Sequence, residues 1–258
     1  MEKKIFPKNY LTDVVLQVDF NNPVTLTTEM IQGVHKALPF EKKEFKEQSI
    51  KILEFKIDKD NEAFNIHQVG KSGTYFINDN AEFPVKFIID NSKFLLSVSK
   101  YSRFSSFFEI FLRGFDTFQN INRIPEFKRI GLRYINIFAL DDEDIKTNAD
   151  WKEFINPAFI PDYSNVKISE TDLTLRRSMN RYYLGDGETF INVYMGIWNK
   201  SFPGMITDKE FILDMDCYVD NKILSESDIT VIPKAMNEKA YKCFFSLLTD
   251  KLKSKLEG

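Results

Sequence analysis

The order of secondary-structure elements that this sequence predicts is repeated on either side of Pro125. An extended segment, a short helix, a run of strands and a long amphipathic helix precede Pro125, and the same order returns after it. Short turns join most of the strands, which is typical of antiparallel hairpins, whereas a parallel sheet needs long crossover connections. Because residues of the two halves do not visibly align, we infer the duplication from element order alone.

The first half contains several predicted strands and one short helix. Residues 13–20 alternate between apolar and polar side chains, which predicts a half-buried strand. Thr27 and Glu29 provide helix-start chemistry, and Pro39 ends a short apolar stripe at helical spacing. Further strands are predicted at residues 50–57, 64–69, 74–77, 85–89 and 94–98, with a turn at Gly70 and Gly73.

A helix with an aromatic face is predicted at residues 102–121. Its phenylalanines recur along one face at helical spacing, at Phe104, Phe107, Phe108, Phe111, Phe115 and Phe118. An aromatic binding surface is one interpretation of this face. We favour the other, in which the helix lies across a sheet and its aromatic face is part of the core.

The second half repeats these elements with longer strands. It opens with a strand at residues 128–138 and a short helix at 151–155. Three strands follow at residues 172–184, 189–198 and 210–219, and residues 185–187 form a hairpin turn between the first two. The last helix is predicted at 233–256, because proline is common in the first helical turn and lysines gather near the last one.

Together these elements predict an α+β fold made of two similar halves, residues 1–124 and 125–258. Each half is a strand, a short helix, an antiparallel meander and a long helix. We expect the halves to join edge to edge into one curved antiparallel sheet, with both long helices on one face, as one continuous structural domain. By shape analogy this is saddle-like and resembles the TATA-binding protein, an analogy of fold rather than of function.

Composition excludes some partners and locations. The net charge of −3 provides no global positive field to attract nucleic acid or an anionic membrane. The first residues lead into no apolar run typical of a secretory signal, and no stretch approaches the length of a membrane helix. We therefore expect a cytoplasmic protein with no membrane partner, in which Cys217 and Cys243 are reduced and buried.

One segment resembles a family signature. Arg129-Ile130-Gly131-Leu132-Arg133-Tyr134-Ile135-Asn136 is similar to the R-I-G-L-R-Y-I-N signature of an uncharacterised, sporadically distributed prokaryotic family of about this length. Residues 10–18 resemble the start of that family, and the aromatic helix ahead of the signature also fits. The resemblance implies no established activity and no catalytic residues. The patchy distribution is similar to that of mobile or defence-associated genes.

The strongest candidate site is a basic and aromatic sheet face. Arg129 and Arg133 lie on one side of the signature strand, about 13 Å apart. The next strand carries Arg177 and Arg181 on one side, and we expect them to form a platform with Tyr182, Tyr194 and Trp198 if that face is exposed. Such a platform suits nucleotides or single-stranded nucleic acid. Alternatively, the arginines pair with carboxylates such as Asp214 and Asp216, or belong to a solvated face.

No motif indicates catalysis, a cofactor or a bound metal. His35 and His67 are the only histidines, and neither has a nucleophile or a second histidine close to it in sequence. Three classes of function stay open: a noncatalytic interaction protein, a nucleic-acid or nucleotide binder, and an enzyme with an unrecognised site. We favour the first, as an accessory or regulatory partner of a toxin, nuclease or defence effector encoded nearby. The sequence does not determine the oligomeric state.

Overall fold

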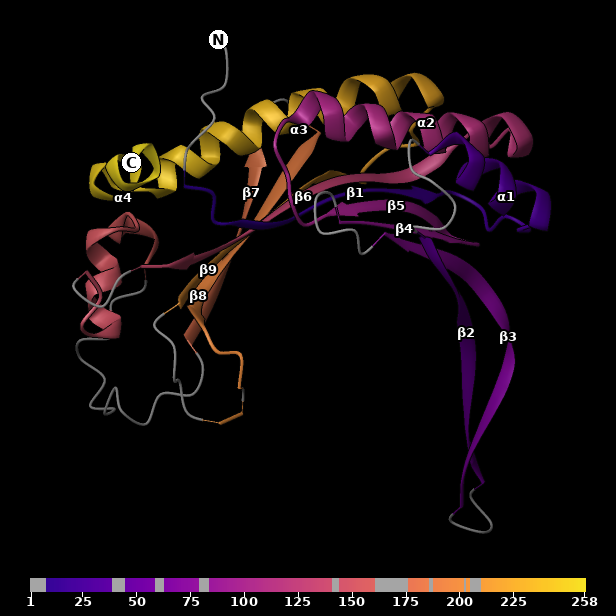
Figure 1. Cartoon of the computed structure of the whole chain (residues 1–258), viewed down its shortest axis with the longest axis horizontal. Helices are drawn as coiled ribbons and strands as arrows, with labels where there is room; N and C mark the ends of the chain where they lie inside the picture. Colours follow the sequence, from indigo (N-terminus) through magenta and orange to yellow (C-terminus); the bar gives the residue numbers. More distant parts are fainter. Residues whose placement is uncertain are drawn as a thin grey trace. The chain divides into compact units, whose positions relative to one another are not determined.

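A computed structural model of the chain describes residues 8–38, 45–58, 63–78, 84–140, 144–160, 176–185, 188–201, 203–204 and 210–258 (Figure 1). The fold is α+β, with one open antiparallel sheet and helices that pack on it, which confirms the predicted fold class. The elements are β1 (Leu11–Phe20), α1 (Thr28–Ala37), β2 (Phe45–Asp58), β3 (Ala63–Asn78), β4 (Val85–Asp90), β5 (Lys93–Val98), α2 (Phe104–Asn122), β6 (Phe127–Ala139), η2 (Asn148–Glu153), η3 (Pro157–Phe159), β7 (Arg176–Leu184), β8 (Thr189–Trp198), β9 (Glu210–Val219), α3 (Glu226–Leu247) and α4 (Asp250–Glu257).

The strand order of the sheet is β2-β3-β4-β5-β1-β6-β9-β8-β7. In this order β1 lies beside β5, the last strand of the first meander, and β6 lies beside β9, the last strand of the second. The two opening strands thus occupy equivalent places, as a duplication would require. Superposition of the two halves stays a prediction.

The chain divides into two compact units. The α2 unit consists of Val15–Ile130 and Asp220–Ile229, and the α3 unit of Met1–Val14, Gly131–Val219 and Thr230–Gly258. The boundary therefore passes through β1 and β6, which each contribute residues to both units. The predicted halves, residues 1–124 and 125–258, divide the chain by the order of its elements rather than by compactness. That division stays a prediction.

The core of the α2 unit is an aromatic cluster around Phe94. The ring centroid of Phe94 lies 5.5 Å from those of Phe111, Phe115 and Phe118, all from α2. At Gly114 an added Cβ would lie 3.2 Å from the Phe94 ring, so the absent side chain lets the helix approach the strands closely. The aromatic face of α2 is therefore core, as predicted.

The ends of α1 and α2 are determined by local hydrogen bonds. The Thr27 hydroxyl accepts from the Met30 backbone N–H and caps α1, as the helix-start residues predict. Helix α2 ends where Arg123 takes a left-handed conformation, with φ of 50°, and donates its backbone N–H to the Gln119 carbonyl.

Strand β3 differs from the prediction. The expected turn at Gly70 and Gly73 is wrong, because β3 continues through both glycines and pairs with β2. The register of this pair shifts between Ile50 and Lys51 and again between Ile52 and Leu53. Glycine within a strand often marks such an irregularity, so these glycines interrupt the register without ending the strand.

In the α3 unit, helix α3 packs on the strand that carries the family-like signature. The Tyr134 hydroxyl donates a 2.8 Å hydrogen bond to Asn237 Oδ1, and the Phe138 ring stacks with that of Phe244 at 6.4 Å. Leu132 and Phe138 are fully buried, and Phe244 is half-buried. The signature strand thus turns its apolar side toward α3.

The predicted last helix has different limits in the structure. It begins at Glu226, ahead of Pro233, because Asp228 accepts hydrogen bonds from the Ser225 backbone N–H and hydroxyl. It also ends earlier, at Leu247, and α4 starts anew with Thr249 as its cap. Because proline has no N–H to donate, Pro233 removes one helical hydrogen bond without ending the helix.

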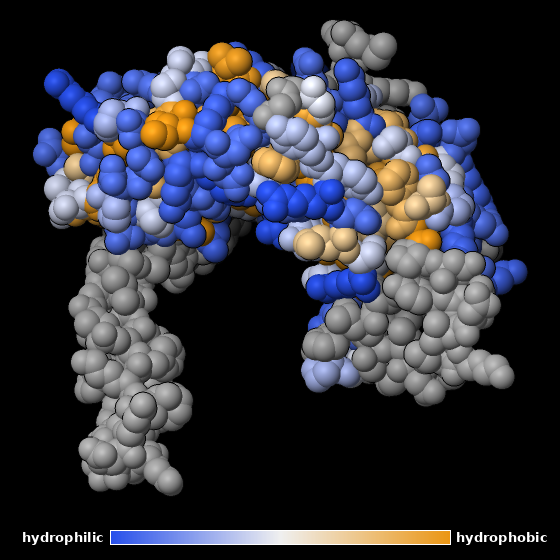
Figure 2. Space-filling view, turned by 180° about the vertical axis from the view of Figure 1, so that it is seen from behind, coloured by the Kyte–Doolittle hydropathy of each residue, from blue (hydrophilic) through white to orange (hydrophobic). Residues whose placement is uncertain are grey.

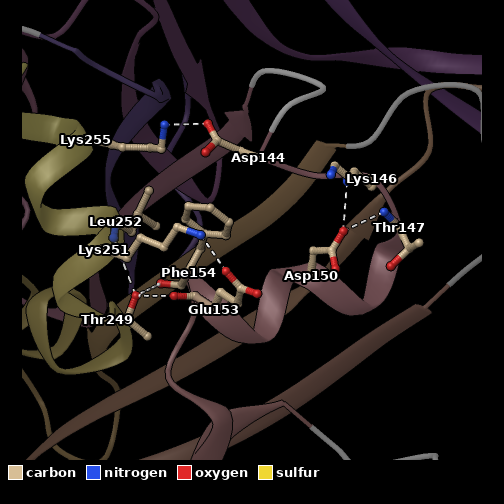
Figure 3. A network of polar contacts seen from close by, with 10 residues as sticks. All are labelled: Asp144, Lys146, Thr147, Asp150, Glu153, Phe154, Thr249, Lys251, Leu252 and Lys255. Atoms are coloured by element: carbon tan, nitrogen blue, oxygen red, sulfur yellow. Dashed lines mark hydrogen bonds and ion pairs between the residues drawn. The ribbon is translucent and has the colours of Figure 1, made fainter.

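Helix α4 is tied to the short 3₁₀ helix η2 and the residues on either side of it by the contacts drawn in Figure 3. The Lys251 ammonium lies 2.5 Å from a Glu153 carboxylate oxygen and 4.4 Å from the centre of the Phe154 ring. The Thr249 hydroxyl donates to the Glu153 carbonyl at 2.6 Å, and Lys255 pairs with Asp144. Leu252 is fully buried beside these contacts, so α4 is held by apolar packing as well as charge.

In the part of the chain that the structure describes, no helix is long and apolar enough to cross a membrane. Figure 2 shows hydrophobic side chains as patches set among hydrophilic ones.

Replacing Phe111 with alanine tests the core assignment. Phe111 is fully buried against Phe94 and Phe115, so Phe111→Ala is expected to lower the free energy of unfolding by about 3–5 kcal/mol. Urea denaturation measures the change. The matched control is Ile223→Ala, since Ile223 is 65% exposed and its truncation should change stability little. Equal losses in both variants would contradict the assignment.

Candidate functional site

Four strands of the α3 unit share a face that points away from α3, which we call the arginine face. Alternation directs Ile191, Val193 and Met195 of β8 inward, where they are buried. The residues between them point to the other side. There the strand register forms cross-strand rows: Arg177, Gly196 and Ile212; Met179, Tyr194 and Asp214; Arg181, Asn192 and Asp216; Tyr183, Phe190 and Tyr218.

Arg177 and Arg181 of the arginine face lie against aromatic rings. The guanidinium carbon of Arg181 is 4.5 Å from the centroid of the Phe190 ring and 5.5 Å from that of Tyr218. That of Arg177 lies 5.2 Å from the centroid of Trp198. Guanidinium groups are attracted to ring faces and keep N–H groups free at the rim. Among the residues described, neither arginine has a carboxylate within ion-pair distance.

Arg133 is engaged in a different way. Its Nε and Nη2 donate to the two carboxylate oxygens of Asp214, at 2.8 and 2.5 Å. The Asp214 side chain is 7% exposed, whereas that of Arg133 is 46% exposed. The hydrogen bonds that Arg133 donates to Asp214 raise the pKa of Arg133, and burial of the guanidinium partly opposes this rise. The pair neutralises Arg133, as the carboxylate-pairing interpretation predicts, so Arg133 alone is not an anion site.

Three apolar or aromatic side chains protrude from the same face. Met179 is 58% exposed, Tyr183 is 55% exposed and Tyr194 is 38% exposed. Trp198 is half-buried under Arg177. The face therefore offers apolar surface beside positive charges that carry no carboxylate partner in the described chain.

The structure brings together most of the predicted candidates. Arg133, Arg177, Arg181, Tyr194 and Trp198 share the arginine face. Arg129 precedes the boundary at Ile130, belongs to the α2 unit and is half-buried.

The predicted place of Tyr182 in the platform is wrong. Tyr182 points to the other side of β7, where its ring centroid lies 6.4 Å from that of Phe159. Its neighbour Tyr183 takes the expected place on the arginine face and contacts Phe190 at 4.9 Å. Sequence reasoning did not include Phe190 or Tyr183 in the platform. Strict alternation from Arg177 and Arg181 places Tyr183 on their face.

The described residues contain no group of three or more side chains placed to hold a metal ion. Burial raises the pKa of Cys243 to about 11, so its thiol stays protonated at neutral pH. Cys217 is fully buried. Cys243 is therefore a poor candidate for a thiolate nucleophile.

No model of a known protein family matches this chain, and no curated protein is similar to it in sequence.

Removing Arg133 tests its role in stability. Arg133→Met leaves the Asp214 carboxylate buried without its partner, so we expect a loss of about 1–3 kcal/mol in the free energy of unfolding. Adding Asp214→Leu should recover part of that loss. The control Arg113→Met breaks an exposed pair with Glu109 and should cost under about 0.5 kcal/mol. Chemical denaturation that gave equal losses for Arg133→Met and Arg113→Met would contradict a structural pair.

Cys243 predicts a pH dependence of stability. Its folded pKa of about 11 lies above that of an unfolded thiol, about 8.5, so the folded state favours the neutral form. The resulting stabilisation is fully present below about pH 8.5 and is lost as pH rises toward the folded value. We expect the free energy of unfolding of the wild type, minus that of Cys243→Ala, to fall over that pH range. Chemical denaturation at each pH measures both values. A difference that does not change with pH would place the thiol at the surface.

Proposed function

We propose that this protein is a noncatalytic interaction protein that binds another protein through its arginine face. The observation that carries this proposal is the exposure of Met179, Tyr183 and Tyr194 beside Arg177 and Arg181. Tyrosine, methionine and arginine are the residue types enriched at protein interfaces, and tyrosine and arginine dominate their binding energy.

The mixed charge of the face favours a protein over a nucleic acid. The same face carries Asp214, Asp216 and Glu210 as well as the arginines of β7, whereas nucleic-acid interfaces are much more uniformly positive. Stacked arginine and aromatic side chains nonetheless suit single-stranded nucleic acid or nucleotides, which makes this the second candidate. The resemblance to a patchily distributed family supports a partner encoded nearby, such as a toxin, nuclease or defence effector.

Photo-crosslinking from the face tests the proposal. A benzophenone amino acid replaces Tyr194, which is 38% exposed, and the chain is irradiated in its native cells. We expect a discrete crosslinked species that protease removes and nuclease does not. The control places the same group at Glu109 of α2, whose side chain is 62% exposed and lies in the other unit.

Three outcomes separate the candidates. A protease-sensitive species formed from position 194 and not from position 109 supports protein binding. A nuclease-sensitive species at 194 favours the second candidate. Equal products at both positions, or none at 194, would overturn the proposal.

A further inference from the structure

The arginine face ends at a sheet edge. Strand β7 is last in the strand order and pairs with β8 along its whole length, from Arg176 with Ile197 to Leu184 with Thr189. A strand paired on one side directs alternate backbone N–H and C=O groups away from the sheet. Among the described residues no other strand receives these groups. An edge of nine residues is long enough to accept a further strand.

The side chains of β7 alternate in exposure. Arg177, Met179, Arg181 and Tyr183 are exposed on the arginine face, whereas Ser178, Asn180, Tyr182 and Leu184 on the opposite side are half-buried. A strand added at this edge would place its own side chains about 4.5–5.5 Å from these four. The β7 edge would therefore contact every second side chain of a partner strand.

Resting on the proposed function, we infer that the β7 edge receives an extended acidic segment of the partner protein as an additional strand. Carboxylates four residues apart would face Arg177 and Arg181, which lie about 13 Å apart along the strand, with an apolar side chain between them against Met179. The rings of Trp198 and Phe190 lie beside the guanidinium groups, and a guanidinium can donate two N–H groups to one carboxylate. Backbone hydrogen bonds would provide affinity, and the arginines specificity.

A second copy of this chain fits the edge poorly. Antiparallel pairing of two β7 strands about Asn180 would set Arg177 opposite Tyr183 and Met179 opposite Arg181. The four arginines that this ladder would place on the arginine face would meet no carboxylate across it, and their mutual repulsion would oppose pairing. An acidic segment supplies the charges that a second copy lacks.

Peptide binding to the whole chain tests the inference. The probe is a fluorescein-labelled peptide in which every second residue is threonine. The residues between the threonines are, in order, glutamate, leucine, glutamate and tyrosine. We expect fluorescence polarisation to show binding about tenfold or more tighter than for the same peptide with lysine in place of glutamate, a difference of about 1.4 kcal/mol. The double variant R177E/R181E should reverse this preference, and the surface control R113E, with circular dichroism to verify folding, should keep it.

Backbone pairing is tested with N-methylated probes. Two versions of the glutamate peptide are methylated on alternate backbone nitrogens. One version carries methyl groups on the odd-numbered nitrogens and the other on the even-numbered nitrogens. A strand that pairs with β7 directs one set of N–H groups to that edge, so one version should lose binding by about tenfold or more and the other should not. Equal binding of both versions and the parent would overturn strand addition.

Other outcomes identify other occupants. Labelled oligothymidine that competes with the peptide and loses binding in R177E/R181E would replace the inference with nucleic-acid binding. A dimer found by light scattering that R177E/R181E abolishes would replace it with self-association. Failure of the glutamate probe with a protein crosslink retained at position 194 would overturn strand addition alone. Failure of both would overturn the proposed function as well.

Discussion

The two-residue period of the strands determines where nearly every side chain of this sheet points. In β8 that period sends Ile191, Val193 and Met195 into the core and leaves Tyr194 exposed between them. In β5 it buries Phe94, Leu96 and Val98, and Phe94 then becomes the centre on which α2 packs. A shift of β8 by one residue would move its buried side chains to the arginine face and its exposed ones to the core. Core and arginine face therefore depend on the same strand register.

Charge on the arginine face is distributed unevenly because of one buried carboxylate. Asp214 lies deep in the row that contains Tyr194 and takes both donors of Arg133. Its negative charge is therefore used inside the protein. Arg177 and Arg181, on the edge strand β7, lie against aromatic rings. The positive charge that remains for a partner is thus concentrated at the edge of the sheet.

Local patterns predicted the parts of the fold that local physics determines. The limits of β8 and β9 coincide with the predicted 189–198 and 210–219, because alternation and turn residues mark both ends. The helix start at Thr27 and the buried face of α2 follow equally from short-range rules.

Contacts between residues far apart in the sequence were harder to predict. Arg133 pairs with Asp214 only because β6 and β9 are neighbours in the sheet, a register that no short segment encodes. Proline at position 233 is typical of a helix start, and the serine and aspartate that begin α3 earlier have the weaker signal. Tyr182 and Tyr183 are adjacent in sequence, and only the register of β7 with β8 decides which of them reaches the arginine face.

The arginines of β7 also bear on the colloidal behaviour of the protein. Like charges on an edge strand discourage copies of a chain from stacking edge to edge into fibres. That repulsion acts over the Debye length, which shrinks from about 10 Å at 0.1 M salt to about 3 Å at 1 M. Dilute buffers thus preserve the protection that Arg177 and Arg181 give, whereas concentrated salt removes it and favours precipitation.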